Sequence, residues 1–103
     1  MESMKETLKK LTIDIQKISD MIYQQKLVEA FQQFSILLNE LTIITDQIFV
    51  LHNRGELEGF DENLYLKTLT EAMGALESRD DVLLADILNY DLLQQIEKII
   101  KQL

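Results

Sequence analysis

LVEAFQQFSILLNELTIITDQIFVL, the sequence of residues 27–51, repeats large apolar residues at intervals of three and four. Because an α-helix turns once every 3.6 residues, this spacing predicts a helix over residues 26–52, about 40 Å long, with one apolar side. A second apolar row widens that side, so we expect contacts with more than one neighbour and the deepest burial in the chain. The two rows are Leu27, Phe31, Phe34, Leu38, Leu41, Ile44, Ile48 and Leu51, and Ala30, Leu37, Ile44 and Leu51.

The same periodicity predicts three further helices, over about residues 2–23, 62–77 and 81–102. Each has an apolar stripe of its own, with polar residues on the remaining sides. The stripes are Met4, Leu8, Leu11, Ile15, Ile18 and Ile22; Tyr65, Leu69, Ala72, Met73 and Leu76; and Ala85, Leu88, Leu92, Ile96, Ile99 and Leu103, flanked by Leu84, Leu93 and Ile100.

Short polar segments at residues 24–26, 53–60 and 78–80 interrupt the apolar pattern. They argue against one long coiled coil, and short connections make consecutive helices antiparallel neighbours. We therefore expect an all-α fold, an up-down-up-down antiparallel four-helix bundle built from two helical hairpins. A length of 103 residues fits a single domain over residues 1–103.

Capping residues mark several of the expected helix ends. Asn53 or Gly55 is suited to the left-handed conformation that commonly ends a helix. Asp61 resembles an N-cap with an aromatic staple residue just before it, and Ser78 or Asp80 is suited to cap the last helix.

The composition excludes several classes of protein. The chain has no proline, which suits long helices with short connections, and no cysteine, which excludes disulfides and thiolate sites and fits the reducing cytoplasm. The N-terminal region is charged every few residues, unlike a signal peptide. Glu40, Asp46 and Asp86 break the longest apolar stretches, so we expect no membrane span and a cytoplasmic protein.

The net charge of −8 repels nucleic-acid phosphates and anionic membrane surfaces, so we expect neither as a partner. Residues 1–54 carry seven acids and six bases, a net of −1, whereas residues 55–97 carry eleven acids and two bases, a net of −9. The last six residues add two positive charges. The acidic C-terminal half is either a solubilising surface or a face for a basic partner.

Residues suited to catalysis are scarce. His52 is the only histidine, and its place near a helix end is typical of a structural polar residue, with a phosphotransfer histidine as the alternative. No phosphate-binding glycine motif or serine-hydrolase motif is present, and the C-terminal aspartates lack the spacing of a calcium loop. We therefore expect no catalytic residue, metal, cofactor or small-molecule substrate, and a protein that is not an enzyme.

The most distinctive stretch is DVLLADILNYDLL, residues 81–93, in which polar residues interrupt a strongly apolar run. Asp86 and Tyr90 are four residues apart and share one helix face. Tyrosine is a common anchor at protein interfaces. The candidate protein-binding residues are Asp81, Asp86, Asn89, Tyr90 and Asp91, and the alternative is a bundle helix whose polar residues point to water.

ALESRDDVLLADILNYDLL, residues 75–93, resembles the C-terminal signature of a short uncharacterised helical family of Gram-positive bacteria. The resemblance implies a helical bundle in a bacterial cytosol and no particular activity. Asn89 departs from the signature, which has an acidic residue at that position. In size and composition the chain is also similar to flagellar export chaperones.

We expect this chain to be a protein-interaction module, an adaptor or chaperone-like protein that holds a helix or a basic segment of a partner. The helix over residues 26–52 carries apolar residues on several faces, among them Ile43 and Val50, and one bundle does not cover them all. The alternative is a self-assembling structural helical protein, such as a homodimer, whose partner is itself.

Overall fold

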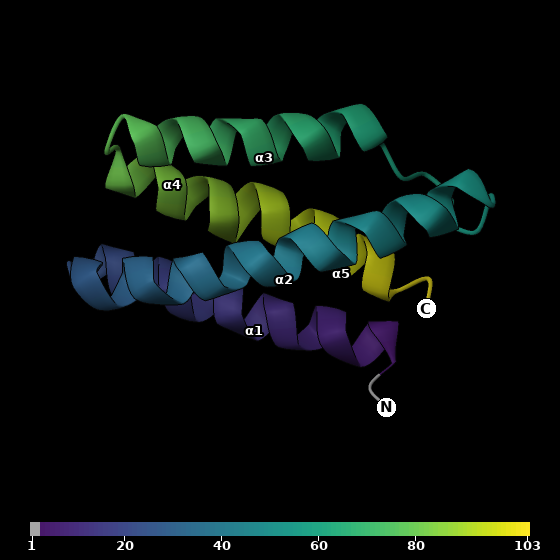
Figure 1. The fold of residues 1–103 in the computed structure, drawn as a ribbon, viewed down its shortest axis with the longest axis horizontal. Coiled ribbons are helices and arrows are strands. Elements are labelled where there is room, and N and C mark those ends of the chain that lie inside the picture. The colour runs from purple at the N-terminus through teal and green to yellow at the C-terminus, as the bar shows by residue number, and fades with distance from the viewer. Residues whose placement is uncertain (1–2) are drawn as a thin grey trace.

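The computed structural model describes residues 3–103 and is all-helical, with no strand among those residues (Figure 1). The first three helices are α1 (Met4–Tyr23), α2 (Leu27–Asn53) and α3 (Glu62–Glu77). The fourth is continuous and has three parts, α4 (Asp81–Asp86), η1 (Ile87–Leu92) and α5 (Leu93–Ile100), which together are called the C-terminal helix. The all-α prediction and the order of four helices are confirmed.

α1 and the C-terminal helix are the two inner helices of the fold. α1 contacts α2 along one side and the C-terminal helix along another, and α3 packs on the C-terminal helix. α2 and α3 are joined by the loop over residues 54–61 at one end of the molecule and stand apart from one another over much of their length (Figure 1). The expectation that α2 is the most buried helix is therefore wrong, because the C-terminal helix has neighbours on two sides and the larger share of buried residues.

A single cluster of buried apolar side chains joins the four helices. On α3 the buried face is centred on Tyr65, Thr68, Ala72 and Ala75, because α3 turns toward the C-terminal helix. Met73 was expected in the core and is exposed instead. Leu103 is also exposed, because it lies beyond the last helical residue, and Ile87, which the predicted stripe omitted, is buried.

Side-chain caps begin three of the helices. Ser3 Oγ accepts from the Glu6 N–H at 3.2 Å, Asp61 from the Leu64 N–H at 3.0 Å, and Asp80 from the Leu83 N–H at 3.2 Å. A cap satisfies backbone donors that have no partner in the first turn. Because Ser3 is the cap, α1 begins at Met4, and the predicted start at residue 2 lies outside the described residues; the caps at residues 61 and 80 agree with prediction.

The first three helices end with the same turn, in which one residue has positive φ. These residues are Gln25 (φ 62°), Gly55 (φ 74°) and Arg79 (φ 57°). In each case the next N–H bonds to the carbonyl five residues back, as from Lys26 to Met21 at 2.8 Å, which is the Schellman arrangement. Gly55, one of the two residues expected to be left-handed, occupies this position without a steric cost.

The C-terminal helix widens into a π turn over Ile87–Leu92. The Leu93 N–H bonds to the Leu88 carbonyl, five residues back instead of four. Buried residues recur five apart here, Ile87 with Leu92 and Leu88 with Leu93, and in a regular α-helix that spacing separates them by about 140° around the axis. The one-residue insertion keeps both pairs in the core, whereas the sequence had predicted an uninterrupted helix.

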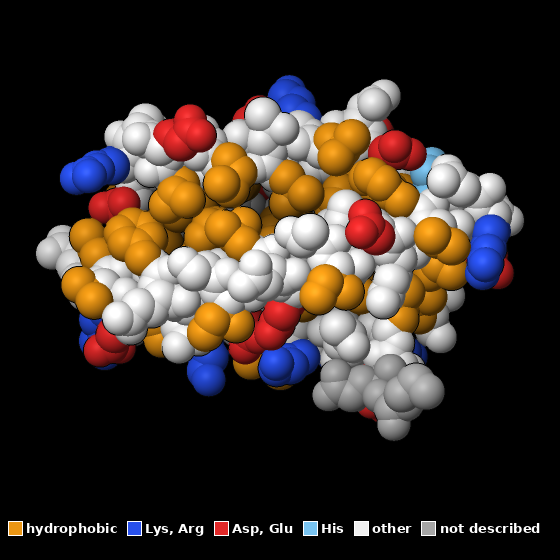
Figure 2. Space-filling model, in the orientation of Figure 1, with side chains coloured by type: hydrophobic (Ala, Val, Ile, Leu, Met, Phe, Trp, Pro, Cys, Tyr) orange, Lys and Arg blue, Asp and Glu red, His pale blue; other side chains and the backbone are white. Residues whose placement is uncertain are grey.

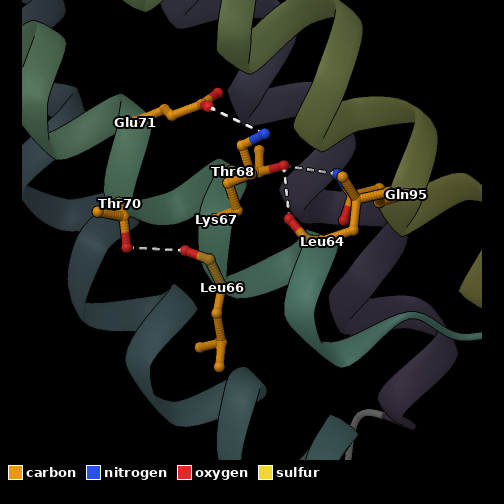
Figure 3. A network of polar contacts seen from close by, with 7 residues as sticks. All are labelled: Leu64, Leu66, Lys67, Thr68, Thr70, Glu71 and Gln95. Carbon is orange, nitrogen blue, oxygen red and sulfur yellow. Dashed lines mark hydrogen bonds and ion pairs between the residues drawn. The ribbon is translucent and has the colours of Figure 1, made fainter.

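A hydrogen-bonded pair joins α3 to α5 at the edge of the core (Figure 3). Gln95 Nε2 donates to Thr68 Oγ1 at 2.8 Å, and the Thr68 hydroxyl donates to the Leu64 carbonyl at 2.9 Å. Thr68 is buried, so these bonds satisfy a polar group that is costly to leave unpaired. Lys67 and Glu71 form an ion pair at 3.9 Å on the outer side of α3.

The end of the chain is joined to the α2–α3 loop. The side chain of Gln102 accepts from the Glu58 N–H at 2.6 Å and donates to the Glu58 carbonyl at 2.9 Å. The C-terminal helix ends at Ile100, two residues before its predicted end, which leaves Gln102 in a turn from which it makes both bonds.

Among the described residues, α2 is the one helix that is long and apolar enough to cross a membrane, with a mean hydropathy of 1.5 over its most apolar window. In length and mean hydropathy, α2 therefore contradicts the expectation that no segment of the chain could span a membrane. A core helix has the same composition, and 28% of this window is buried in the fold. Both Glu40 and Asp46 lie within α2.

Candidate protein-binding groove

An apolar groove of about 460 Å³ opens between α2 and α3 (Figure 2). Figure 2 shows the orange side chains gathered along it, between the two helices. Its floor is formed by the C-terminal helix, whose Leu88 and Leu92 are almost fully buried. The lining residues, which we call the α2–α3 groove, are Phe34, Leu38, Leu41, Thr42, Thr45, Asp46, Leu69, Ala72, Met73, Leu88 and Leu92.

The groove exists because the apolar side of α2 is wider than the surface that α1 covers. The centre of that side, including Leu37 and Ile44, is buried. The adjoining row, with Leu38 and Thr42, borders the groove. The predicted second neighbour of α2 is present only at the loop end, so part of the wide apolar side has no helix against it.

An aromatic cluster of Phe49, Phe60 and Tyr65 holds α2 and α3 together at the loop end. The Phe49 and Tyr65 rings meet edge to face at 6.0 Å between centroids, and Phe60 lies 6.4 Å from Phe49 and 5.7 Å from Tyr65. Such pairs contribute about 0.5–1.5 kcal/mol beyond the burial of their area. Phe60 precedes the Asp61 cap and contacts Tyr65 four residues after it, which confirms the predicted staple.

Polar contacts strengthen this end of the groove. The hydroxyl groups of Thr45 and Tyr65 lie 2.7 Å apart, and burial raises the pKa of the Tyr65 phenol while the Thr45 hydrogen bond opposes the rise. His52 Nε2 lies 3.7 Å from a Glu62 carboxylate oxygen, and its ring packs edge-on against Phe60. His52 therefore lies in the last turn of α2, near the helix end at which the sequence placed it.

The lining of the groove carries one charged side chain, the carboxylate of Asp46, and no basic one. Thr42 and Thr45 are the other polar residues, and the Thr42 hydroxyl already donates to the Leu38 carbonyl. A ligand for this surface therefore needs an apolar side, and a positive charge near Asp46 complements the rim.

Two of the five candidate residues from the sequence lie together with a tyrosine that the sequence reasoning missed. Tyr23, in the last turn of α1, donates a hydrogen bond to the Asp86 carboxylate. That bond, burial and the charge of Asp86 raise the pKa of Tyr23 to about 12, with smaller contributions from Tyr90 and Asp20. Asp86 and Tyr90 thus lie close to the end of α1 and outside the groove.

The other three candidate residues do not join this group. Asp81 is in the first turn of α4, where its charge favours the positive end of the helix. Asn89 is half-buried within the π turn. Asp91 faces α3 and lines a shallow hollow with Lys67 and Lys98. The structure therefore divides the predicted patch between two sides of the C-terminal helix.

A family model described as Domain of unknown function (DUF8042) matches residues 1–102. The chain belongs to this family. The match agrees with the expectation of an uncharacterised family. Comparison with curated proteins and with solved structures found no match.

The sequence of this DUF8042 chain did not indicate that the lining residues of the α2–α3 groove lie together, and it did not indicate a role for Tyr23. A sequence signal for the groove existed in the width of the apolar side of α2, but it did not show which part α1 covers. No group of three metal-binding side chains lies together within residues 3–103 of the DUF8042 chain.

Proposed function

We propose that this DUF8042 chain is a protein-interaction module, an adaptor or chaperone-like protein that holds an amphipathic helix of another protein in the α2–α3 groove. The observation that carries the proposal is the partly exposed apolar lining of the groove, which includes the half-buried Leu38 and Leu69 and the exposed Met73. Exposed apolar grooves rimmed by polar residues are typical of surfaces that bind protein helices.

A helix is the ligand that this groove fits best. The lining side chains come from rows on α2 and α3, and helices pack by placing the ridge of one between such rows of others. A third helix laid between α2 and α3 would cover the side of α2 that α1 leaves open. Asp46 on the rim and the net charge of −9 over residues 55–97 favour basic residues on the polar side of the ligand.

The proposal includes the setting expected from the sequence. We place the protein in a bacterial cytoplasm, as a binding protein without catalytic activity, and we propose an up-down-up-down topology in which two helical hairpins leave the α2–α3 side open. The absence of cysteine and the presence of one histidine support this assignment. Genes beside the one that encodes this chain are the first source of candidate partners.

Binding of defined synthetic helices tests the proposal. The probe is a fluorescent 20-residue amphipathic peptide with leucine on one side and lysine on the other, measured by anisotropy at two salt concentrations. We expect saturable binding, and a counterpart with glutamate in place of lysine should bind at least tenfold more weakly. Both peptides binding equally, or neither binding, contradicts the proposal.

A matched pair of variants locates the binding site. Thr42→Trp places a large ring on the groove wall, whereas Thr70→Trp places the same ring on the exposed side of α3 outside the lining. Both threonines are exposed and both donate to the carbonyl four residues back at 2.9 Å, so the local effects of substitution are alike. Thr42→Trp should weaken binding of the lysine peptide at least tenfold, and Thr70→Trp should leave it unchanged.

A further inference from the structure

The α3 wall of the α2–α3 groove carries a thioether, the side chain of Met73. Met73 is 37% exposed and lines the groove beside Leu69. The chain has no cysteine, so its four methionines hold all of its sulfur. Met4 and Met21 are half-buried against the core, and neither lines the groove. Among the described residues, Met73 is therefore the sulfur group through which a reagent in solution can change the groove.

A peroxide converts the thioether of an exposed methionine into a sulfoxide. The sulfur attacks one oxygen of hydrogen peroxide, an S–O bond forms and the O–O bond breaks. The sulfur is oxidised by two electrons, and the departing hydroxide takes the proton of the transferred oxygen and leaves as water. The product is a polar side chain whose oxygen accepts hydrogen bonds, in place of an apolar one.

The lining of the groove has no free donor for a sulfoxide oxygen. The carboxylate of Asp46 only accepts hydrogen bonds, and the hydroxyl of Thr42 already donates to the carbonyl four residues back. Thr45 shares its hydroxyl with Tyr65, and the remaining lining side chains are apolar. The apolar side of a ligand laid over an oxidised Met73 would bury the sulfoxide oxygen without a partner, which weakens binding.

We propose that Met73 is an oxidation site through which peroxides regulate the groove. With the thioether in place the groove holds the apolar side of a partner helix, and with the sulfoxide it releases that helix. This inference rests on the proposed function, because it concerns the same groove. A bound helix covers Met73, so it should also slow the reaction of Met73 with peroxide.

Peptide binding before and after oxidation tests the switch. The protein is the full chain treated with hydrogen peroxide, the probe is the fluorescent lysine peptide, and mass spectrometry measures the oxidation of each methionine separately. Oxidation of Met73 should weaken peptide binding at least tenfold. The two methionine sulfoxide reductases, one for each sulfoxide epimer, should restore binding when dithiothreitol supplies the electrons.

Two variants separate Met73 from the other methionines. Met73→Leu keeps an apolar side chain of similar volume and cannot be oxidised, so it should bind the peptide like wild type both before and after peroxide treatment. Met73→Gln places an amide where the sulfoxide would be and should weaken binding at least tenfold without any oxidant. Saturating peptide should slow the oxidation of Met73 and leave the rates at Met4 and Met21 unchanged.

The outcomes distinguish this inference from the proposed function. If unoxidised wild type does not bind the lysine peptide, the proposed function fails and the switch fails with it. If it binds and the oxidation of Met73 leaves binding unchanged, the switch alone is overturned. Loss of binding by peroxide-treated Met73→Leu also overturns the switch, because the loss then arises at another residue.

Discussion

The phenol of Tyr23 donates a hydrogen bond to the carboxylate of Asp86, which joins the last turn of α1 to the C-terminal helix just before its π turn. The two residues are 63 apart in sequence. The contact therefore requires both the register of α1 and the position of the π turn to be as described.

Replacing Asp86 by asparagine should lower the pKa of Tyr23 from about 12 toward 10, because the substitution removes the negative charge and the strongest hydrogen-bond acceptor. Tyrosinate absorbance at 295 nm during an alkaline titration measures this change. Tyr65, whose pKa is raised by burial, serves as the internal control and should titrate alike in both proteins. If Asp86→Asn leaves the titration curve unchanged, the Asp86 carboxylate does not raise the pKa of Tyr23.

The same pair predicts a pH dependence of stability. The folded pKa of Tyr23 lies above its ordinary value, so its contribution is complete below pH 10 and is lost as the pH rises through about 12. Urea unfolding at a series of pH values should show wild type losing more of its stability over this window than Tyr23→Phe does. Parallel curves would mean that the phenol contributes nothing.

Arg79→Gly should stabilise the fold by roughly 0.5–1 kcal/mol, because Arg79 has a φ of 57° and glycine avoids the steric cost of that conformation. Thermal and urea unfolding measure the change. Arg54→Gly is the matched control: Arg54 has a φ of −84° at the C-cap, so glycine there should cost stability by increasing the freedom of the unfolded chain. Equal effects at the two positions would show that the left-handed turn is not a source of strain.

Two isoleucines on α2 should differ sharply on truncation. Ile48 is fully buried, and Ile48→Ala should destabilise the fold by about 2–5 kcal/mol because it leaves a cavity. Ile43 is largely exposed, and Ile43→Ala should change stability by less than about 0.5 kcal/mol. Urea unfolding at 1 µM compares them, and similar losses would mean that the side of α2 facing the core is assigned wrongly.

Deletion of Asn89 should leave a folded protein. The π turn is a one-residue insertion, so removing a residue within it converts the turn to regular α-helix and shortens the helix without rotating its two halves far apart. Deletion of Gln16 from α1, which has no such insertion, should rotate Ile18 and Ile22 by about 100° out of the core. Thermal unfolding followed by circular dichroism should remain cooperative for the Asn89 deletion and should lose its cooperativity for the Gln16 deletion.

Much of the fold was predictable from local patterns. The bounds of α3 agree with prediction to the residue, because Asp61 provides a cap and the stripe that follows is unambiguous. Predicted bounds of α2 were displaced by one residue, since the terminal turn carries no strong capping side chain. The π turn was not predicted. Residues 81–93 carry apolar side chains on every face of the helix, so a five-residue spacing does not stand out in their sequence.

The candidate site was predicted only in part. Spacing placed Asp86 and Tyr90 on one face, and both do lie near Tyr23, but sequence spacing gives no information about which neighbouring helix a polar face meets. Met73 was placed in the core for the same reason. Apolar residues cover both the core side and the groove side of α3, so the sequence pattern does not separate the two sides. The groove itself depends on how far apart α2 and α3 stand, which is a property of tertiary packing.

The two hydrogen bonds between Gln102 and Glu58 make hydrogen exchange at the Glu58 amide depend on the position of the last turn of the chain. An amide in an exposed loop ordinarily exchanges its hydrogen with solvent within seconds, but the Glu58 N–H is bonded to a side chain at the far end of the sequence. Its exchange rate therefore reports fraying of the chain terminus, so deuterium uptake at a single mid-chain position measures how often the last turn opens.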